Sequence, residues 1–446
     1  MNNLGIIKSF PKDFLFGVAT SSYQIEGSSF GSCGESHWDA LSKKNGMIFQ
    51  NQNGSKACEH FFRWKQDLEL IKDAGFSAYR FSFSWPRILP SGKKIINNEG
   101  VEFYDRLIDH LLELNIKTFG TLYHWDLPNC LAENGGWQNR DTAKYFGDYS
   151  ELIIKKFGDR LFSIATINEP WCVSWLSHYI GEHAPGIKDK NAAVKSMHNI
   201  LLAHGKSLSR MRDYNHKNLG IVLNKNYCQS YNNSEEAIEA TSICDEIYNL
   251  WFDEALFNGK YPKKTLNIFE QYMPKQFEDD LLEISKPIDW IGINYYTRSL
   301  VDYDKNDKFV KFKQKRGNLE VTDMGWEIFP EGLEFLLKRL KSDYSKNIPI
   351  HITENGMARD DKLENGSIND FERISFFDNH LKVLLKLISE GMPLKSYFAW
   401  SLLDNFEWAY GYAKRFGIVY VDYSSQKRIP KSSYKEFKRN LSNQQI

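Results

Sequence analysis

Two glutamates in similar surroundings are the residues best placed to do chemistry in this 446-residue chain. Residues 350–357 read IHITENGM, an apolar strand-like run that ends at Glu354 and turns at Asn355-Gly356. Residues 165–171 read ATINEPW and present Glu169 in the same way, before a proline. A pair of carboxyl groups suits cleavage of a glycosidic bond. One protonates the leaving oxygen, and the other attacks the anomeric carbon or activates water.

Amide, imidazole, carboxylate and indole side chains follow the other strand-like runs. They include Gln24, His124, Asn294, Trp400, Glu407 and Trp408. Such groups suit a sugar, because a buried hydroxyl left without a partner costs about 1–3 kcal/mol and indole faces cover C–H surfaces. We find no HExxH, no Ser-His-Asp arrangement and no CxxC among the six cysteines. The sequence therefore predicts neither a metal nor another cofactor.

Short apolar runs alternate with longer amphipathic ones, which is typical of βα units and a parallel sheet. We expect strands at 14–19, 78–83, 117–123, 162–168, 219–224, 290–294, 349–354 and 396–400. We expect helices at 61–74, 101–114, 143–157, 192–214, 234–257, 331–340 and 371–390, and surface loops at 301–320 and 365–370.

Eight strands with helices between them predict a single (β/α)8 barrel domain over residues 1–446, with its active site at the C-terminal ends of the strands. A doubly wound open sheet is the competing fold. That fold would need a phosphate-cradling GxGxxG after the first strand, and Gly17-Val18-Ala19-Thr20 does not supply it.

Charge and composition exclude some partners. Acidic and basic residues balance at 57 each, which argues against nucleic acid or an anionic membrane surface. No apolar run approaches the roughly 18–20 residues that a membrane span needs. No basic region followed by a long apolar run marks a signal peptide, and the scattered cysteines indicate reduced thiols. We therefore expect a cytoplasmic protein whose oligomeric state the sequence does not reveal.

Six motifs together resemble glycoside hydrolase family 1, the β-glucosidase family. They read YQIEG, YHWDLP, TINEP, GINYYTR, ITENG and WSLLDNFEW, in that order from about residue 10 to about residue 434. The resemblance implies a retaining (β/α)8 β-glucosidase that acts by double displacement through a covalent glycosyl-enzyme. It implies β-glucosides or cello-oligosaccharides as substrates and a place in cellulose degradation.

The resemblance also implies roles for individual residues. Glu169 resembles the acid/base, Glu354 the nucleophile and Asn168 the partner of the sugar 2-hydroxyl. The other matches are Arg80, Asn294 and Tyr296 around the nucleophile, Gln24, His124, Glu407 and Trp408 in the glycone clamp, Trp400 as its stacking floor and Trp326 as the aglycone platform. Cys172, close to Glu169, is expected only to pack, and His178 and His183 are expected to line the entrance or cap a loop.

The two glutamates should differ in protonation. Arg80, if adjacent, favours ionised Glu354, whose negative charge then raises the pKa of Glu169. Once the sugar esterifies Glu354, that charge disappears and Glu169 ionises more readily. A retaining pair of carboxyl groups lies about 5–5.5 Å apart, against roughly 6.5–9.5 Å in an inverting pair.

Three further functions stay open. A branch of the family cleaves 6-phosphoglycosides and normally has Ser where Glu407 stands, followed by Lys and Tyr, where this chain has Lys414 and Phe416. Glu407 would repel a phosphate dianion, so we expect unphosphorylated glucosides and include Phe416 among the predicted substrate-binding residues. A transglycosidase is the second of these functions, and a non-catalytic sugar-binding relative is the third.

Overall fold

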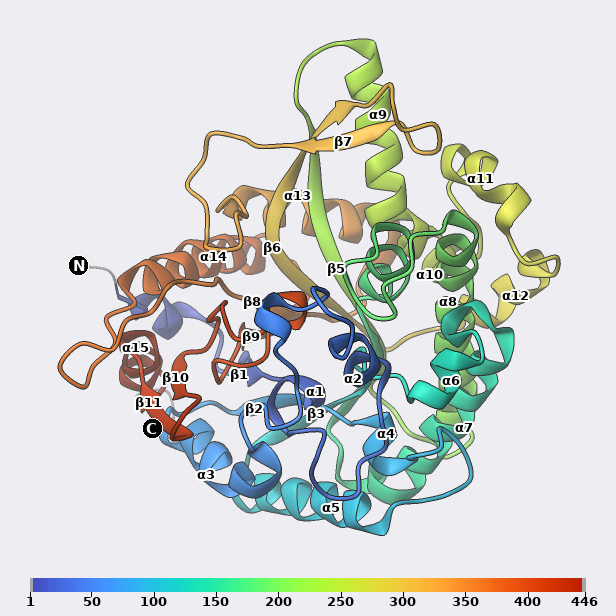
Figure 1. The fold of residues 1–446 in the computed structure, drawn as a ribbon. Coiled ribbons are helices and arrows are strands. Elements are labelled where there is room, and N and C mark those ends of the chain that lie inside the picture. Colours follow the sequence, from blue (N-terminus) through green and yellow to red (C-terminus); the bar gives the residue numbers. More distant parts are fainter. Residues whose placement is uncertain (1–2, 443–446) are drawn as a thin grey trace.

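The eight predicted strands form a closed parallel barrel in the computed structural model, which describes residues 3–442 (Figure 1). Each strand pairs with the next, and the last pairs with the first, which confirms the (β/α)8 fold. The barrel strands are β1 (Leu15–Ala19), β2 (Ala78–Ser82), β3 (Lys117–Tyr123), β4 (Ser163–Asn168), β5 (Leu219–Ser230), β6 (Trp290–Tyr303), β8 (Ile350–Asn355) and β9 (Leu394–Trp400).

Helices surround this barrel (Figure 1). The longer ones are α3 (His60–Asp73), α5 (Asn98–Glu113), α7 (Arg140–Phe157), α8 (Lys190–Arg212), α9 (Glu235–Asp245), α10 (Trp251–Asn258), α12 (Phe277–Ile284), α13 (Pro330–Leu340), α14 (Phe371–Ser389) and α15 (Ser432–Leu441). The shorter ones are α1 (Ser22–Ile25), α2 (His37–Ser42), α4 (Trp85–Ile88), α6 (Asn129–Glu133) and α11 (Lys263–Phe269).

The strands are easy to recognise in the sequence because helices cover them outside and side chains fill the barrel inside. Every residue of β2 and of β4 is buried. Strands buried on both faces are mostly apolar along their length, as expected for a parallel sheet. Polar residues are then concentrated where each strand ends, and this is where the predicted site residues lie.

Strands β5 and β6 extend well beyond their predicted ends at residues 224 and 294. Together with β7 (Phe312–Lys315), which pairs antiparallel with β6, they form a sheet that projects above the barrel (Figure 1). We call residues 225–230, 295–303 and 312–315 the wing. The prediction that 301–320 is only a surface loop is therefore wrong. Val301 is buried against α9, but Asp302 and Tyr303 after it are at least partly exposed, so the segment read as polar.

Other elements also differ from the predictions. The helix expected at 234–257 is α9 and α10 joined by a π-helical turn, Glu246–Leu250. Helix α15 and the hairpin of β10 (Val419–Asp422) and β11 (Lys427–Pro430) were not predicted, because they are short and rich in charged residues. Residues 365–370 form a loop, as expected. Within residues 3–442, no helix is long and apolar enough to cross a membrane.

Candidate active site

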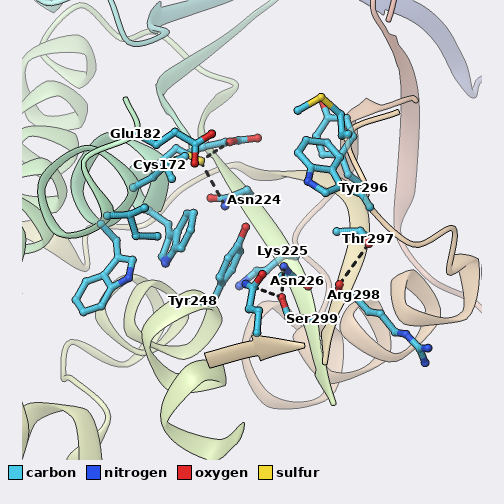
Figure 2. Close-up of a pocket in the computed structure, with 18 of the residues that line it drawn as sticks. Cys172, Glu182, Asn224, Lys225, Asn226, Tyr248, Tyr296, Thr297, Arg298 and Ser299 are labelled. Carbon is cyan, nitrogen blue, oxygen red and sulfur yellow. Dashed lines mark hydrogen bonds between the residues drawn. The ribbon is translucent and has the colours of Figure 1, made fainter. Parts of the chain in front are cut away.

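A cavity of about 880 Å³ opens at the C-terminal ends of the barrel strands, and part of it is drawn in Figure 2. Ten of the thirteen predicted site residues line it: His124, Glu169, Asn294, Tyr296, Trp326, Glu354, Trp400, Glu407, Trp408 and Phe416. The other three, Gln24, Arg80 and Asn168, are buried and contact lining residues directly. The fold thus brings all thirteen to one place.

Glu354 lies at the end of β8, with both carboxylate oxygens occupied. Arg80 Nη1 donates to Oε1 and the Tyr296 hydroxyl donates to Oε2, each at 2.6 Å. Glu354 is only 3% exposed, so burial raises its pKa, while Arg80 and Tyr296 oppose that rise. Gly356, two residues on, passes so close to the Trp400 carbonyl oxygen that a Cβ would lie 1.9 Å from it. The Asn-Gly pair after Glu354 therefore needs its glycine.

Glu169 follows β4 and sits in a strained backbone conformation. Its φ is +51°, in the left-handed region that a non-glycine residue adopts at a cost of roughly 1–3 kcal/mol. The turn directs its side chain into the cavity. Burial, and then the negative charge of Glu354, raise the pKa of Glu169 to about 7. The raised pKa favours a protonated Glu169 near neutral pH, which is the direction expected from the sequence.

The donors around Glu169 are weaker than those around Glu354. Asn294 Nδ2 donates to Oε1 at 2.6 Å, and the Cys172 thiol donates to Oε2 at 3.0 Å. Neither donor carries a charge, whereas Glu354 has a guanidinium. The expectation that Cys172 only packs is incomplete, since this buried thiol is bonded directly to Glu169.

Asn168 and Asn294 connect the two carboxyl groups. Arg80 Nη2 donates to Asn168 Oδ1 at 2.7 Å, and Asn294 Nδ2 approaches the same oxygen at 3.1 Å. Asn294 also pairs with Glu354 across β6 and β8, and its hydrogen bonding lowers the pKa of Glu354. One amide therefore touches both acids.

His124, Trp400 and Trp408 form one aromatic wall of the cavity. The His124 ring stacks on Trp400 at 5.7 Å and on Trp408 at 6.1 Å, with interplanar angles of 18° and 17°. Burial, and then Arg80, lower the pKa of His124 well below its ordinary value. The imidazole is thus neutral and can donate or accept a hydrogen bond.

Glu407 lines the cavity beside Gln24. Gln24 Nε2 donates to Glu407 Oε2 at 3.4 Å and to the Phe406 carbonyl oxygen at 2.9 Å. Burial and the charges of Glu354 and Glu169 raise the pKa of Glu407 to about 8. A sugar hydroxyl pair would give this carboxyl the partners that it needs to ionise.

Lys414, the residue that left a phosphoglycoside substrate open, does not line the cavity. Its ammonium donates to the Asp323 carbonyl oxygen and lies over the ring of Tyr410. Phe416 packs on Tyr296 and Trp326 at ring distances of 6.1 and 6.2 Å. Lys414 is thus engaged elsewhere and does not offer its charge to a phosphate beside Glu407.

Several lining residues were not among the predicted ones. Asn224 and Tyr248 form a second wall together with Cys172, and Asn226 and Ser299 continue it onto the wing (Figure 2). Sequence reasoning missed them because Asn224, Asn226 and Ser299 lie at or beyond the predicted end of a strand, and Tyr248 lies in the π-helical turn between α9 and α10. His183 also lines the cavity, which is one of the two roles expected for it. His178 is buried and does not line the cavity. No group of three or more His, Cys, Asp or Glu residues within 3–442 is arranged to hold a metal ion.

Comparison with known proteins places the chain. The family model described as glycosyl hydrolase family 1 matches residues 6–445. The chain belongs to glycosyl hydrolase family 1. It is 46% identical over 432 residues to a 1,4-beta-D-glucan glucohydrolase from Thermotoga neapolitana, covering 96% of this chain and 97% of that protein. It is 44% identical to a beta-glucosidase from an Agrobacterium species, covering 96% and 94% of the two chains.

Solved structures agree. A family 1 β-glucosidase from Thermotoga maritima superposes with a TM-score of 0.94 at 44% identity, covering 98% of each chain. The same level of similarity extends to a GH1 β-glucosidase from Exiguobacterium antarcticum, with a TM-score of 0.94 and 41% identity. The family membership predicted from the six motifs is thus confirmed.

Proposed function

We propose that this protein is a retaining β-glucosidase, with Glu354 as nucleophile and Glu169 as acid/base. The observation that carries the proposal is the pair of buried carboxyls on one cavity in contrasting surroundings. Glu354 is bound to a guanidinium, and Glu169 has only an amide and a thiol. Relatives named beta-glucosidase and glucohydrolase, each covered almost completely, support the same activity.

The first step transfers the glucosyl group to the enzyme. Glu354 Oε2 or Oε1 attacks the anomeric carbon while the proton of Glu169 passes to the glycosidic oxygen, and the aglycone leaves as an alcohol. Arg80 keeps Glu354 ionised until attack, because the guanidinium favours the carboxylate. Tyr296 holds the carboxylate in its orientation through a 2.6 Å bond.

The second step returns the enzyme to its starting state. Esterified Glu354 no longer carries charge, so the pKa of Glu169 falls and its carboxylate takes a proton from water. The hydroxide equivalent attacks the same anomeric carbon and releases glucose with its β configuration retained. Gln24, His124, Glu407 and Trp408 then serve to bind the glucose hydroxyls, with Trp400 under the ring.

Azide tests both assignments at once. In Glu354→Ala, we expect hydrolysis of a nitrophenyl β-glucoside to fall by several orders of magnitude and azide to yield α-glucosyl azide. In Glu169→Ala, azide should instead yield the β anomer, since it intercepts the covalent intermediate. NMR of the products distinguishes the two. A non-catalytic sugar-binding protein would turn over no substrate even before mutation.

Two competing functions are tested by substrate and product. We expect nitrophenyl glucoside to be hydrolysed faster than its 6-phosphate, since Glu407 lines the cavity and Lys414 is bonded elsewhere. The reverse order would favour the phosphoglycosidase. Product analysis at high glucoside concentration separates hydrolysis from transglycosylation. We propose β-glucosides or cello-oligosaccharides as substrates. We also propose a cytoplasmic location, which cell fractionation tests.

A further inference from the structure

Cys172 is the buried thiol bonded to Glu169, and neither step of the double displacement uses it. It begins the π-helix Cys172–Ile180, which follows the left-handed turn at Glu169. Its Sγ lies 3.0 Å from Glu169 Oε2, and it is 6% exposed, on the cavity wall. Irregular turns of this kind are frequent at functional sites.

The two oxygens of Glu169 are not equivalent. Thr353 Oγ1 donates to Asn294 Oδ1 at 2.7 Å, which fixes that amide with its NH₂ group toward Glu169. Glu169 Oε1 therefore accepts a hydrogen bond from nitrogen and has no room for a proton of its own in that direction. Oε2, the oxygen beside the thiol, faces the weaker of the two donors, so the proton that Glu169 gives to the leaving group is favoured on Oε2.

The thiol is itself oriented toward that oxygen. Asn224 Nδ2 donates to Cys172 Sγ at 3.8 Å from the other side, a contact drawn in Figure 2. With its sulfur accepting from Asn224, the S–H is free to point at Glu169. Burial, and then the negative charge of Glu169, raise the pKa of Cys172 well above its ordinary value, so the thiol stays protonated and can only donate to the carboxylate.

We propose that Cys172 is a positioning residue for the acid/base, whose S–H bond to Oε2 steadies Glu169 in its ionised state. When the proton leaves Oε2 for the glycosidic oxygen, the S–H bond strengthens; when water returns a proton to Oε2, it weakens. The thiol neither gains nor loses a proton. A thiol is a weak donor, so Glu169 is held without becoming too weak a base.

Other groups also act on Glu169 and are unchanged by substitution of Cys172. They face it from every neighbouring element: Arg80 on β2, Tyr248 before α10, Tyr296 on β6, Glu354 on β8 and Glu407 after β9. These contributions are the same in every variant at position 172. A difference in pH profile between two such variants therefore reports the hydrogen bond from residue 172 to Glu169.

The test, which rests on the proposed function, is the basic limb of kcat/KM against pH for phenyl β-glucoside. In Cys172→Ala the carboxylate loses a donor, so we expect this limb to move up by about 0.5 to 1 pH unit. Cys172→Ser, with a stronger donor, should restore the wild-type position or move the limb lower. Cys172→Val, which fills the same space without a donor, replaces the alanine variant if that protein does not fold.

Controls separate this inference from the function itself. Cys130→Ala, at a partly buried thiol on α6 away from the cavity, should leave the limb in place. Glu169→Ala should abolish the limb for an activated dinitrophenyl glucoside; if it does not, the acid/base assignment fails. If it does, but Cys172→Ala and Cys172→Val change only kcat or stability while the limb stays fixed, Cys172 merely packs and the inference is wrong.

Discussion

At the scale of single residues, the site depends on Arg80 being beside one acid and not the other. It is buried, it donates to Glu354 Oε1, and its second nitrogen holds Asn168. The same charge thus opposes the rise that burial causes in the pKa of Glu354, the proposed nucleophile, and holds the amide next to Glu169, the proposed acid/base. Two glutamates with nearly equal burial acquire different roles from one guanidinium.

Replacing Arg80 should therefore change the acid limb of the pH profile. In Arg80→Met, the pKa of Glu354 rises further, so a higher pH is needed to ionise the nucleophile and the acid limb of kcat/KM moves up. We expect kcat to fall by about 10²–10³ as well. Stopped assays from pH 4 to 8 measure both. Arg210→Met, on the exposed side of α8, is the control, and an acid limb that does not move would contradict the assigned role.

At the scale of elements, the loop after β9 carries Glu407 and Trp408 and is fixed by buried ion pairs. Asp404 accepts from Lys431 Nζ and Arg415 Nη1, each at 2.7 Å, and from the Gly417 amide at 2.9 Å. Lys431 also reaches Asp361, so the loop is tied to the segment that precedes α15 and to the one that follows β8. The loop that carries Glu407 and Trp408, two residues of the proposed glycone clamp, is thus held in place by buried charges.

Asp404→Asn tests this support. Removing one partner of a buried pair leaves an uncompensated charge, so we expect a loss of roughly 3–5 kcal/mol in the free energy of unfolding. The KM for glucoside should rise because Glu407 and Trp408 lose their positions. Asp378→Asn breaks an i,i+4 pair with the mostly exposed Lys382 and should cost at most about 1 kcal/mol. Urea unfolding measures the loss of stability, and initial rates measure KM. Equal effects from the two variants would show that the ion pairs of Asp404 do not hold the loop in place.

The wing is the element that shapes the outer cavity. Asn226, Ser299 and Gln314 form one hydrogen-bonded row on it, with Asn226 to Ser299 at 2.9 Å and Gln314 to Ser299 at 3.0 Å. These residues line the same cavity as Glu169 and Glu354, and they offer polar groups to a longer substrate. They belong to a sheet, so they hold their positions without a ligand.

We therefore expect chain length to matter. The kcat/KM should be several-fold higher for cellotriose than for cellobiose in the wild-type protein. Ser299→Ala, which removes the centre of the row, should reduce that preference while leaving nitrophenyl glucoside hydrolysis unchanged. Chromatography of the products measures the preference. Equal rates on the two oligosaccharides would show that the wing contributes nothing to substrate binding.

At the scale of the whole molecule, the buried Glu407 lowers the stability of the folded protein at high pH. The folded state raises the pKa of Glu407 from 4.5 to about 8, so the folded protein retains a proton that the unfolded chain releases. This stabilisation is fully present below about pH 4.5 and is lost as the pH rises towards 8, so the wild-type protein loses stability over that window relative to a neutral side chain.

Glu407→Gln should therefore stabilise the protein more at pH 8 than at pH 5. At about 1.36 kcal/mol per pKa unit, the gain at pH 8 is on the order of 4 kcal/mol, against less than about 1 kcal/mol at pH 5. Urea unfolding at the two pH values measures it. Glu364→Gln, in an exposed loop, should show no such difference, and a gain independent of pH would be incompatible with the raised pKa.

Sequence reasoning found most of this molecule because a barrel strand buried on both faces leaves a distinct apolar run, and Glu169 and Glu354 each end one. It missed the wing, where most of the residues after Val301 are polar and at least partly exposed, and it missed the bond from Cys172 to Glu169. That bond depends on a left-handed residue and a π-helix, which no periodicity in the sequence reports. The extent of a single domain over residues 1–446 stays a prediction.

The pairing of β9 with β1 has a consequence for how the protein is made. Leu15 pairs with Ser396, so the final seam of the barrel joins segments from the two ends of the chain. Gln24 and Glu407 meet only across this seam. During synthesis, nearly the whole chain must therefore leave the ribosome before the sugar-binding site can form. Pairings between segments so far apart in the sequence also form slowly. In refolding, recovery of catalysis should follow the slowest phase, after most helical signal has returned.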